Sequence, residues 1–164
     1  MLRAPEGMLT QVLIALIAFL GLLAGYLLTL LAKEEIKPGR KYFIILERAI
    51  LIILALVLLS QVWTTKTFVI PFIIGLIMGY VLRLRYLYLG LALAASVSLS
   101  MEFFVVVASL IFLHGLPYGS ISSKLKLPLH LVLFFIPVLI MLFFSPNNAN
   151  LLLPFVAGTL VLQK

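Results

Sequence analysis

The sequence predicts an all-α protein, a polytopic bundle of transmembrane helices without a soluble domain, and three observations support this fold class. Hydrophobic types make up 65% of the 164 residues and charged types only 10%, whereas soluble domains are roughly 45–50% apolar and about 25% charged. The mean hydropathy is +1.30. The apolar residues form long runs separated by short polar segments, as helices that cross a bilayer do. We therefore expect residues 1–164 to form one integral membrane domain.

The first long apolar run, Met8–Ala32, predicts a retained transmembrane helix. As a helix it measures about 37 Å, which exceeds the ~30 Å hydrocarbon core and the apolar stretch of a cleaved signal peptide. A polar turn is expected at Lys33–Lys41, where Pro38 and Gly39 interrupt helical geometry. The second and third spans are predicted over Tyr42–Trp63 and Thr67–Leu82.

The second half of the chain contains three further apolar runs of unequal length. Leu87–His114 has 28 residues, and such a helix of about 42 Å must tilt strongly or break. Leu129–Ser145 predicts a fifth span with a kink at Pro137. Leu151–Leu162 is only about 18 Å long as a helix, which is short for a full crossing. The sequence therefore predicts six spans, or five spans and a short re-entrant C-terminal segment.

A glycine pattern recurs in the first and third predicted spans. The pair Gly21 and Gly25 matches the pair Gly75 and Gly79 at an offset of 54 residues. In both pairs the second glycine is followed by a tyrosine. Glycines four residues apart let two helix backbones approach closely, and packing is the simpler interpretation. The alternative is duplication of a two-helix unit, as in many transporters. The two repeats would then cover residues 8–63 and 67–114.

A second short pattern links the third and last apolar runs. Pro71-Phe72-x-x-Gly75 recurs as Pro154-Phe155-x-x-Gly158. This pattern has the same two interpretations, packing or duplication.

The composition argues against most catalytic chemistry. The chain has no cysteine and no aspartate, which removes thiol catalysis, Cys-ligated metals and Asp-dependent metal or phosphoryl-transfer sites. Five glutamates and two histidines remain, and they form no recognisable metal-ligand pattern. We expect no enzyme, no cofactor and no bound metal.

Glu102 is the leading candidate for a functional residue, because it lies inside the 28-residue apolar run. An ionisable group at mid-membrane costs at least ~2.5–3.5 kcal/mol on insertion scales. Helical spacing places Ser98 and Ser109 on the same face, which predicts a buried polar stripe that handles a proton, a cation or a substrate. Two other interpretations stay open: Glu102 locks helices together, or the helix breaks at Ser98–Met101 and leaves Glu102 at the membrane interface.

Arg48 is the charged residue best suited by type to pair with Glu102, although the two differ in predicted depth by more than ten ångströms, at about 1.5 Å per residue. Arg48 is therefore included in the predicted substrate or ion site. The alternative for Arg48 and the adjacent Glu47 is that both side chains reach back to the membrane surface.

A weaker candidate site surrounds the polar segment Gly115–Pro128. Histidine and lysine side chains there could bind a phosphate or lipid headgroup. The alternative is that they mark helix ends. The residues are His114, Lys124, Lys126 and His130.

The positive charge predicts orientation and lipid contacts. The net charge is +7, and no water-exposed basic domain exists that would bind nucleic acid. Seven Lys and Arg residues fall on the side of the first and third loops, against five on the other, which places those loops in the cytoplasm by the positive-inside rule. We expect a multi-pass protein of the cell membrane that contacts anionic lipids.

These features together predict a small transport-type or transport-associated membrane protein. The alternative is a non-enzymatic structural or accessory subunit, which would pack against a membrane partner or a second copy of itself.

Overall fold

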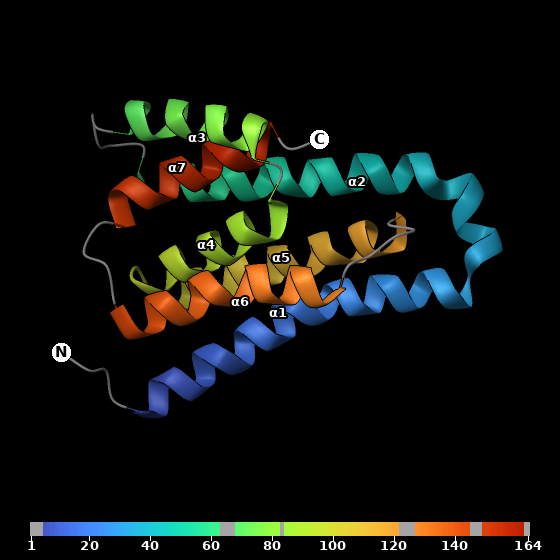
Figure 1. The fold of residues 1–164 in the computed structure, drawn as a ribbon, viewed down its shortest axis with the longest axis horizontal. Helices are drawn as coiled ribbons and strands as arrows, with labels where there is room; N and C mark the ends of the chain where they lie inside the picture. The colour runs from blue at the N-terminus through green and yellow to red at the C-terminus, as the bar shows by residue number, and fades with distance from the viewer. Residues whose placement is uncertain (1–4, 63–67, 83, 122–126, 145–148, 163–164) are drawn as a thin grey trace.

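The computed structural model describes residues 5–62, 68–82, 84–121, 127–144 and 149–162, which form α-helices and no strand (Figure 1). The predicted all-α fold class is thus confirmed for this part of the chain. The seven described helices are α1 (Pro5–Leu31), α2 (Lys33–Ser60), α3 (Val69–Val81), α4 (Arg85–Val97), α5 (Met101–Ile121), α6 (Leu127–Phe144) and α7 (Ala149–Val161).

Successive helices run in alternating directions along the long axis of the bundle (Figure 1). Helices α1, α3, α5 and α7 run one way, and α2, α4 and α6 run back. Helix α1 packs on α5, α3 packs on α7, and α4 packs on α6, while α2 contacts both α5 and α7. Each of the three principal pairs therefore joins two parallel helices that are distant in sequence.

Three helices are long and apolar enough to cross a membrane: Leu9–Leu31, Pro38–Ser60 and Met101–Ile121. The other apolar helical segments are shorter, between 10 and 17 residues. The outer surface of the bundle carries many large apolar side chains, such as Leu31 at 84% and Ile70 at 70% exposure. These properties are compatible with a membrane location, whereas the predicted number of six spans is not confirmed.

The expected turn at Lys33–Lys41 is helical instead. Helix α2 begins at Lys33 and continues through Pro38. Pro38 is the sixth residue of α2, so it removes one backbone hydrogen bond and kinks the helix rather than ending it. The chain still reverses, because the first turns of α2 lie across the end of the bundle before the helix bends and runs back (Figure 1).

The fourth predicted span, Leu87–His114, is not one helix. Helix α4 ends at Val97 and α5 begins at Met101, and α5 runs back beside α4 (Figure 1). Ser100 explains the break, because its hydroxyl oxygen accepts a hydrogen bond from the backbone N–H of Phe103 at 3.1 Å. This bond is that of a helix N-cap, so a new helix begins where the long apolar run had suggested continuity.

Glycines bring α1 and α5 into direct backbone contact. A Cβ built at Gly25 would lie 2.8 Å from the carbonyl oxygen of Gly115, and one at Gly115 would lie 2.7 Å from the carbonyl carbon of Gly21. Hydroxyls join the same helices: Thr29 donates to the carbonyl of Ser120 at 2.8 Å, and Ser120 donates to the carbonyl of Gly25 at 3.2 Å. We call this contact the α1–α5 seam.

Helices α3 and α7 meet in the same way. A Cβ at Gly79 would lie 2.7 Å from Thr159 Cα, and one at Gly75 would lie 2.9 Å from the Phe155 carbonyl carbon. In return, a Cβ at Gly158 would lie 2.9 Å from the nitrogen of Leu76. The two Pro-Phe-x-x-Gly copies thus pack against each other. Whether the repeated glycines also record a duplication stays a prediction.

Helix α4 contacts α6 through Gly90, where a Cβ would lie 2.8 Å from Pro137 Cγ. The remaining core is apolar and includes Leu54, Leu93, Phe104 and Phe134.

Candidate functional site

The predicted polar stripe around Glu102 is not buried, and this expectation is corrected. Ser98, Glu102 and Ser109 are all exposed. Ser98 donates to the carbonyl of Ala95, and Ser109 donates to the carbonyl of Val105, so both hydroxyls are used within their own helices. Because α5 begins at Met101, Glu102 lies in its first turn, where an acid is favoured by the helix dipole.

Arg48 is also exposed, and the structure does not bring it to Glu102. Its neighbour Glu47 is 5% exposed and faces the interior. Glu47 continues the buried face of α2 formed by Leu51 and Leu54, whereas Arg48 shares a face with the exposed Ile52. One residue of helical rotation therefore separates a core glutamate from a surface arginine.

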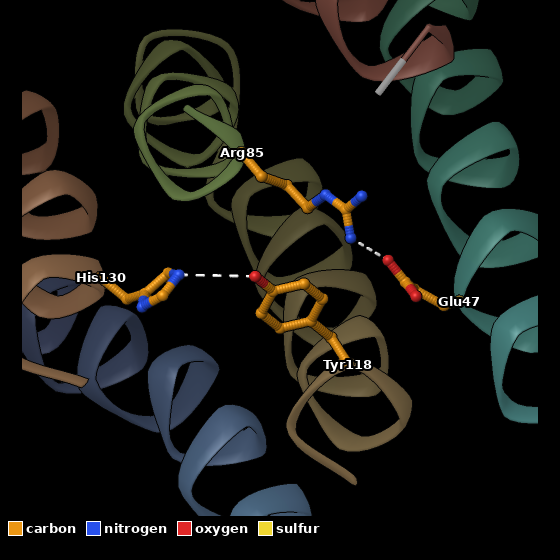
Figure 2. Close-up of polar contacts among 4 residues, drawn as sticks. All are labelled: Glu47, Arg85, Tyr118 and His130. Carbon is orange, nitrogen blue, oxygen red and sulfur yellow. Dashed lines mark hydrogen bonds and ion pairs between the residues drawn. The ribbon is translucent and has the colours of Figure 1, made fainter. Parts of the chain in front are cut away.

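Glu47 forms an ion pair with Arg85, the first residue of α4 (Figure 2). The Glu47 carboxylate oxygen Oε1 accepts a hydrogen bond from Arg85 Nη1. The two side chains are only 7% and 14% exposed. The pair joins α2 to α4, and the mutual charge offsets the cost of taking each group out of water.

Tyr118 lies between this ion pair and His130 (Figure 2). The guanidinium carbon of Arg85 is 4.9 Å from the centre of the Tyr118 ring, which is a cation–π contact. The Tyr118 hydroxyl lies 3.4 Å from His130 Nε2. A line of polar contacts therefore crosses the bundle from α2 through α4 and α5 to α6.

Two further polar side chains touch the Tyr118 ring. The Tyr86 and Tyr118 ring centres are 5.5 Å apart, and those of His114 and Tyr118 are 5.8 Å apart. The Tyr86 hydroxyl and both ring nitrogens of His114 have no hydrogen-bond partner among the described residues. His114 is fully buried and Tyr86 is 2% exposed. We call the whole group the polar cluster: Glu47, Arg85, Tyr86, His114, Tyr118 and His130.

The weaker headgroup site is only partly described. His114 is enclosed in α5 rather than at a helix end, so the expectation that it meets a headgroup at the surface is corrected. His130 is half-buried in the polar cluster. Lys124 and Lys126 lie outside the described residues. No group of three or more His or acidic side chains that could hold a metal occurs in the described ranges.

The charges of the described chain are unevenly distributed between the two ends of the bundle. Helices α1 and α5 end, and α2 begins, towards the right in Figure 1, whereas α3 ends and α4 begins near the middle of the bundle's length. We call the end where α2 begins the basic end, because four of the six basic residues with a described backbone lie in the first nine residues of α2: Lys33, Lys37, Arg40 and Lys41. The other two lie farther along the bundle, since Arg48 is the sixteenth residue of α2 and Arg85 pairs with its neighbour Glu47. Glu102 begins α5 at the opposite end.

Sequence reasoning missed the ion pair of the polar cluster. It left Glu47 at the membrane surface as one interpretation, counted Arg85 as a loop cation and gave Tyr86 no role. His114 and His130 were named, but for the weaker headgroup site. One signal was available in the sequence: Leu51 and Leu54 follow Glu47 by four and seven residues, so the three side chains share one helix face. That face could not be identified as the core, because every face of these helices is apolar.

Comparisons with protein-family models, with curated proteins and with solved structures find no match for this chain.

Proposed function

We propose that this chain is an integral membrane protein of the transport type whose charged centre is the Glu47–Arg85 pair. One observation supports the proposal: two opposite charges from different helices meet inside a bundle whose core is mainly apolar. Ionisable side chains inside membrane bundles are costly and commonly mark ion or substrate pathways. The centre replaces Glu102, which is exposed at a helix start. The proposal includes no catalytic step.

The alternative is a structural or accessory subunit, and the same pair also favours it. Glu47 and Arg85 satisfy each other's charge, and the α1–α5 seam holds two helices in backbone contact. In this case the pair fixes helix positions, and the exposed apolar surface receives a membrane partner or a second copy.

We also propose that the basic end faces the cytoplasm of a cell membrane. Four of the six basic residues with a described backbone lie at this end, and the positive-inside rule places such ends in the cytoplasm. The first loop lies at this end and keeps its expected side in this proposal, and the cytoplasmic side of the third loop stays a prediction. The same charges favour contact with anionic lipids.

Flux measurements distinguish the two functions. The protein is reconstituted in vesicles containing a pH-sensitive dye, and a potassium diffusion potential drives proton movement. Transport through the charged centre predicts flux in the natural protein and its loss in Glu47→Gln and Arg85→Gln. Glu102→Gln and Arg48→Gln remove the same charges from exposed positions and serve as matched controls. Natural protein without flux above empty vesicles would refute proton transport through the charged centre and favour the structural function.

Orientation is tested by labelling, and the absence of cysteine makes the natural chain a ready background. Single cysteines at Arg40 and Glu102, at opposite ends, are treated in intact cells with a membrane-impermeant maleimide. We expect labelling of the Glu102 position alone; labelling of the Arg40 position alone would reverse the orientation.

A further inference from the structure

The polar cluster contains buried hydrogen-bonding groups that pair with none of the described residues. Tyr86 and His114 are buried, yet the Tyr86 hydroxyl and both His114 nitrogens lack a partner among the described residues. Buried polar groups in folded proteins nearly always have a partner in the protein, a water or a ligand. Each one left without a partner costs about 1–3 kcal/mol. The cluster is therefore incomplete as the protein alone forms it.

A hydrogen-bond acceptor would satisfy the donors of this group, whereas the second ring nitrogen of a neutral His114 is itself an acceptor and needs a donor such as water. A guanidinium has five N–H donors and no acceptor, and the Arg85 contact with Glu47 that the structure describes uses one nitrogen, Nη1. Tyr86 adds a hydroxyl, and a neutral His114 adds one N–H. Glu47 is the only acidic side chain in the cluster. This donor set fits a group with several oxygen acceptors and negative charge, for which arginine offers paired, planar donors.

We propose that the polar cluster is a binding site for a phosphate-type oxyanion, which takes the place of the Glu47 carboxylate on Arg85. The oxyanion would accept hydrogen bonds from Arg85 and from the Tyr86 and His114 donors around the Tyr118 ring. Glu47 then acts as the resident competitor, which occupies Arg85 when no ligand is bound. The inference deepens the proposed function, since it names the ligand class of the same charged centre.

Two members of the cluster are not fully enclosed. Arg85 begins α4 and His130 lies in the first turn of α6. His130 is half-buried and Arg85 retains 14% exposure. The same chemistry suits free phosphate and the phosphate headgroup of a lipid.

Thermal unfolding in detergent tests the site without relying on transport. The melting temperature is measured while inorganic phosphate is titrated against potassium chloride of equal ionic strength. In a second arm, a short-chain phosphatidic acid is titrated against a short-chain phosphatidylcholine. A rise with phosphate assigns the site to a free oxyanion, and a rise with phosphatidic acid alone assigns it to a lipid headgroup.

Variants separate the cluster from general charge effects. Arg85→Gln should weaken the apparent affinity by about tenfold or more, as expected for loss of a charge-assisted contact. Arg48→Gln removes the same charge at an exposed position and should bind as the natural protein does. Glu47→Gln should bind more tightly, because the competitor is gone.

The outcomes are distinct from those of the flux test. Absence of a thermal shift in both arms, or an equal shift in the natural protein and Arg85→Gln, would overturn the oxyanion site. Weaker binding by Glu47→Gln would overturn the competition step. A protein that binds phosphate but passes no protons would keep the site and lose the proposed transport.

Discussion

Gly25→Ala tests how much the stability of the α1–α5 seam depends on the absence of a side chain at Gly25. The new methyl carbon would lie 2.8 Å from the Gly115 oxygen and 2.9 Å from the Leu116 carbonyl carbon. Favourable separations are roughly 3.5–4.0 Å, and both obstacles are backbone atoms that no side-chain rotation can move. The helices must therefore separate by about half an ångström or more, which forfeits a quarter or more of each nearby dispersion contact.

Over-packing of this kind costs about 1–3 kcal/mol. Replacing a helical glycine by alanine also gains about 0.5–1 kcal/mol of helix stability, which must be separated from the packing cost. Gly7→Ala is the matched control, because it lies in the same helix and a Cβ there meets nothing within 4 Å. We expect the free energy of unfolding, from reversible denaturation in mixed detergent micelles, to be about 1–3 kcal/mol lower for Gly25→Ala than for Gly7→Ala. Equal values for the two variants would show that the seam does not need glycine.

Three further variants test other contacts. Glu47→Gln leaves Arg85 without its partner and should destabilise the protein by up to about 3–5 kcal/mol in the same denaturation assay. The exposed Glu102→Gln should change stability by less than about 1 kcal/mol, and similar losses for both would argue against the buried ion pair. Thr29→Val removes the hydroxyl that links α1 to α5 in the seam. The loss of stability should be about 0.6 kcal/mol and at most about 1.7 kcal/mol, measured as a lower melting temperature. An unchanged melting curve would contradict a stabilising hydrogen bond at Thr29. Ser100→Ala removes the N-cap of α5 and should cost about 1 kcal/mol, visible as faster hydrogen exchange in the first turn of α5; unaltered exchange there would show that Ser100 does not cap the helix.

The sequence predicted the helical class because composition alone decides it. Long apolar runs in a chain with 10% charged residues leave few other folds. Several helix bounds also follow from those runs, since α1 and α6 nearly coincide with their predicted spans.

The placement of polar residues could not be predicted as well, for a physical reason. In a soluble helix the apolar face is the core, so burial can be read from periodicity. A helix surrounded by lipid is apolar on all sides, and Glu47 and Arg48 then look equivalent although one is buried and one is exposed. The N-cap at Ser100 could have been predicted, since a serine followed by an acid such as Glu102 in the first turn is a known signal of a helix start. The length of the apolar run obscured it.

The glycine contacts leave one helix apart from the rest. They bring α1 and α5, α3 and α7, and α4 and α6 into direct backbone contact. The glycine of α2, Gly39, lies within 4 Å only of the Phe43 side chain in its own helix. Helix α2 is instead held by apolar side chains packed against α5 and α7 and by the Glu47–Arg85 pair to α4. Its position therefore depends on side chains, which can repack more easily than two backbones in direct contact.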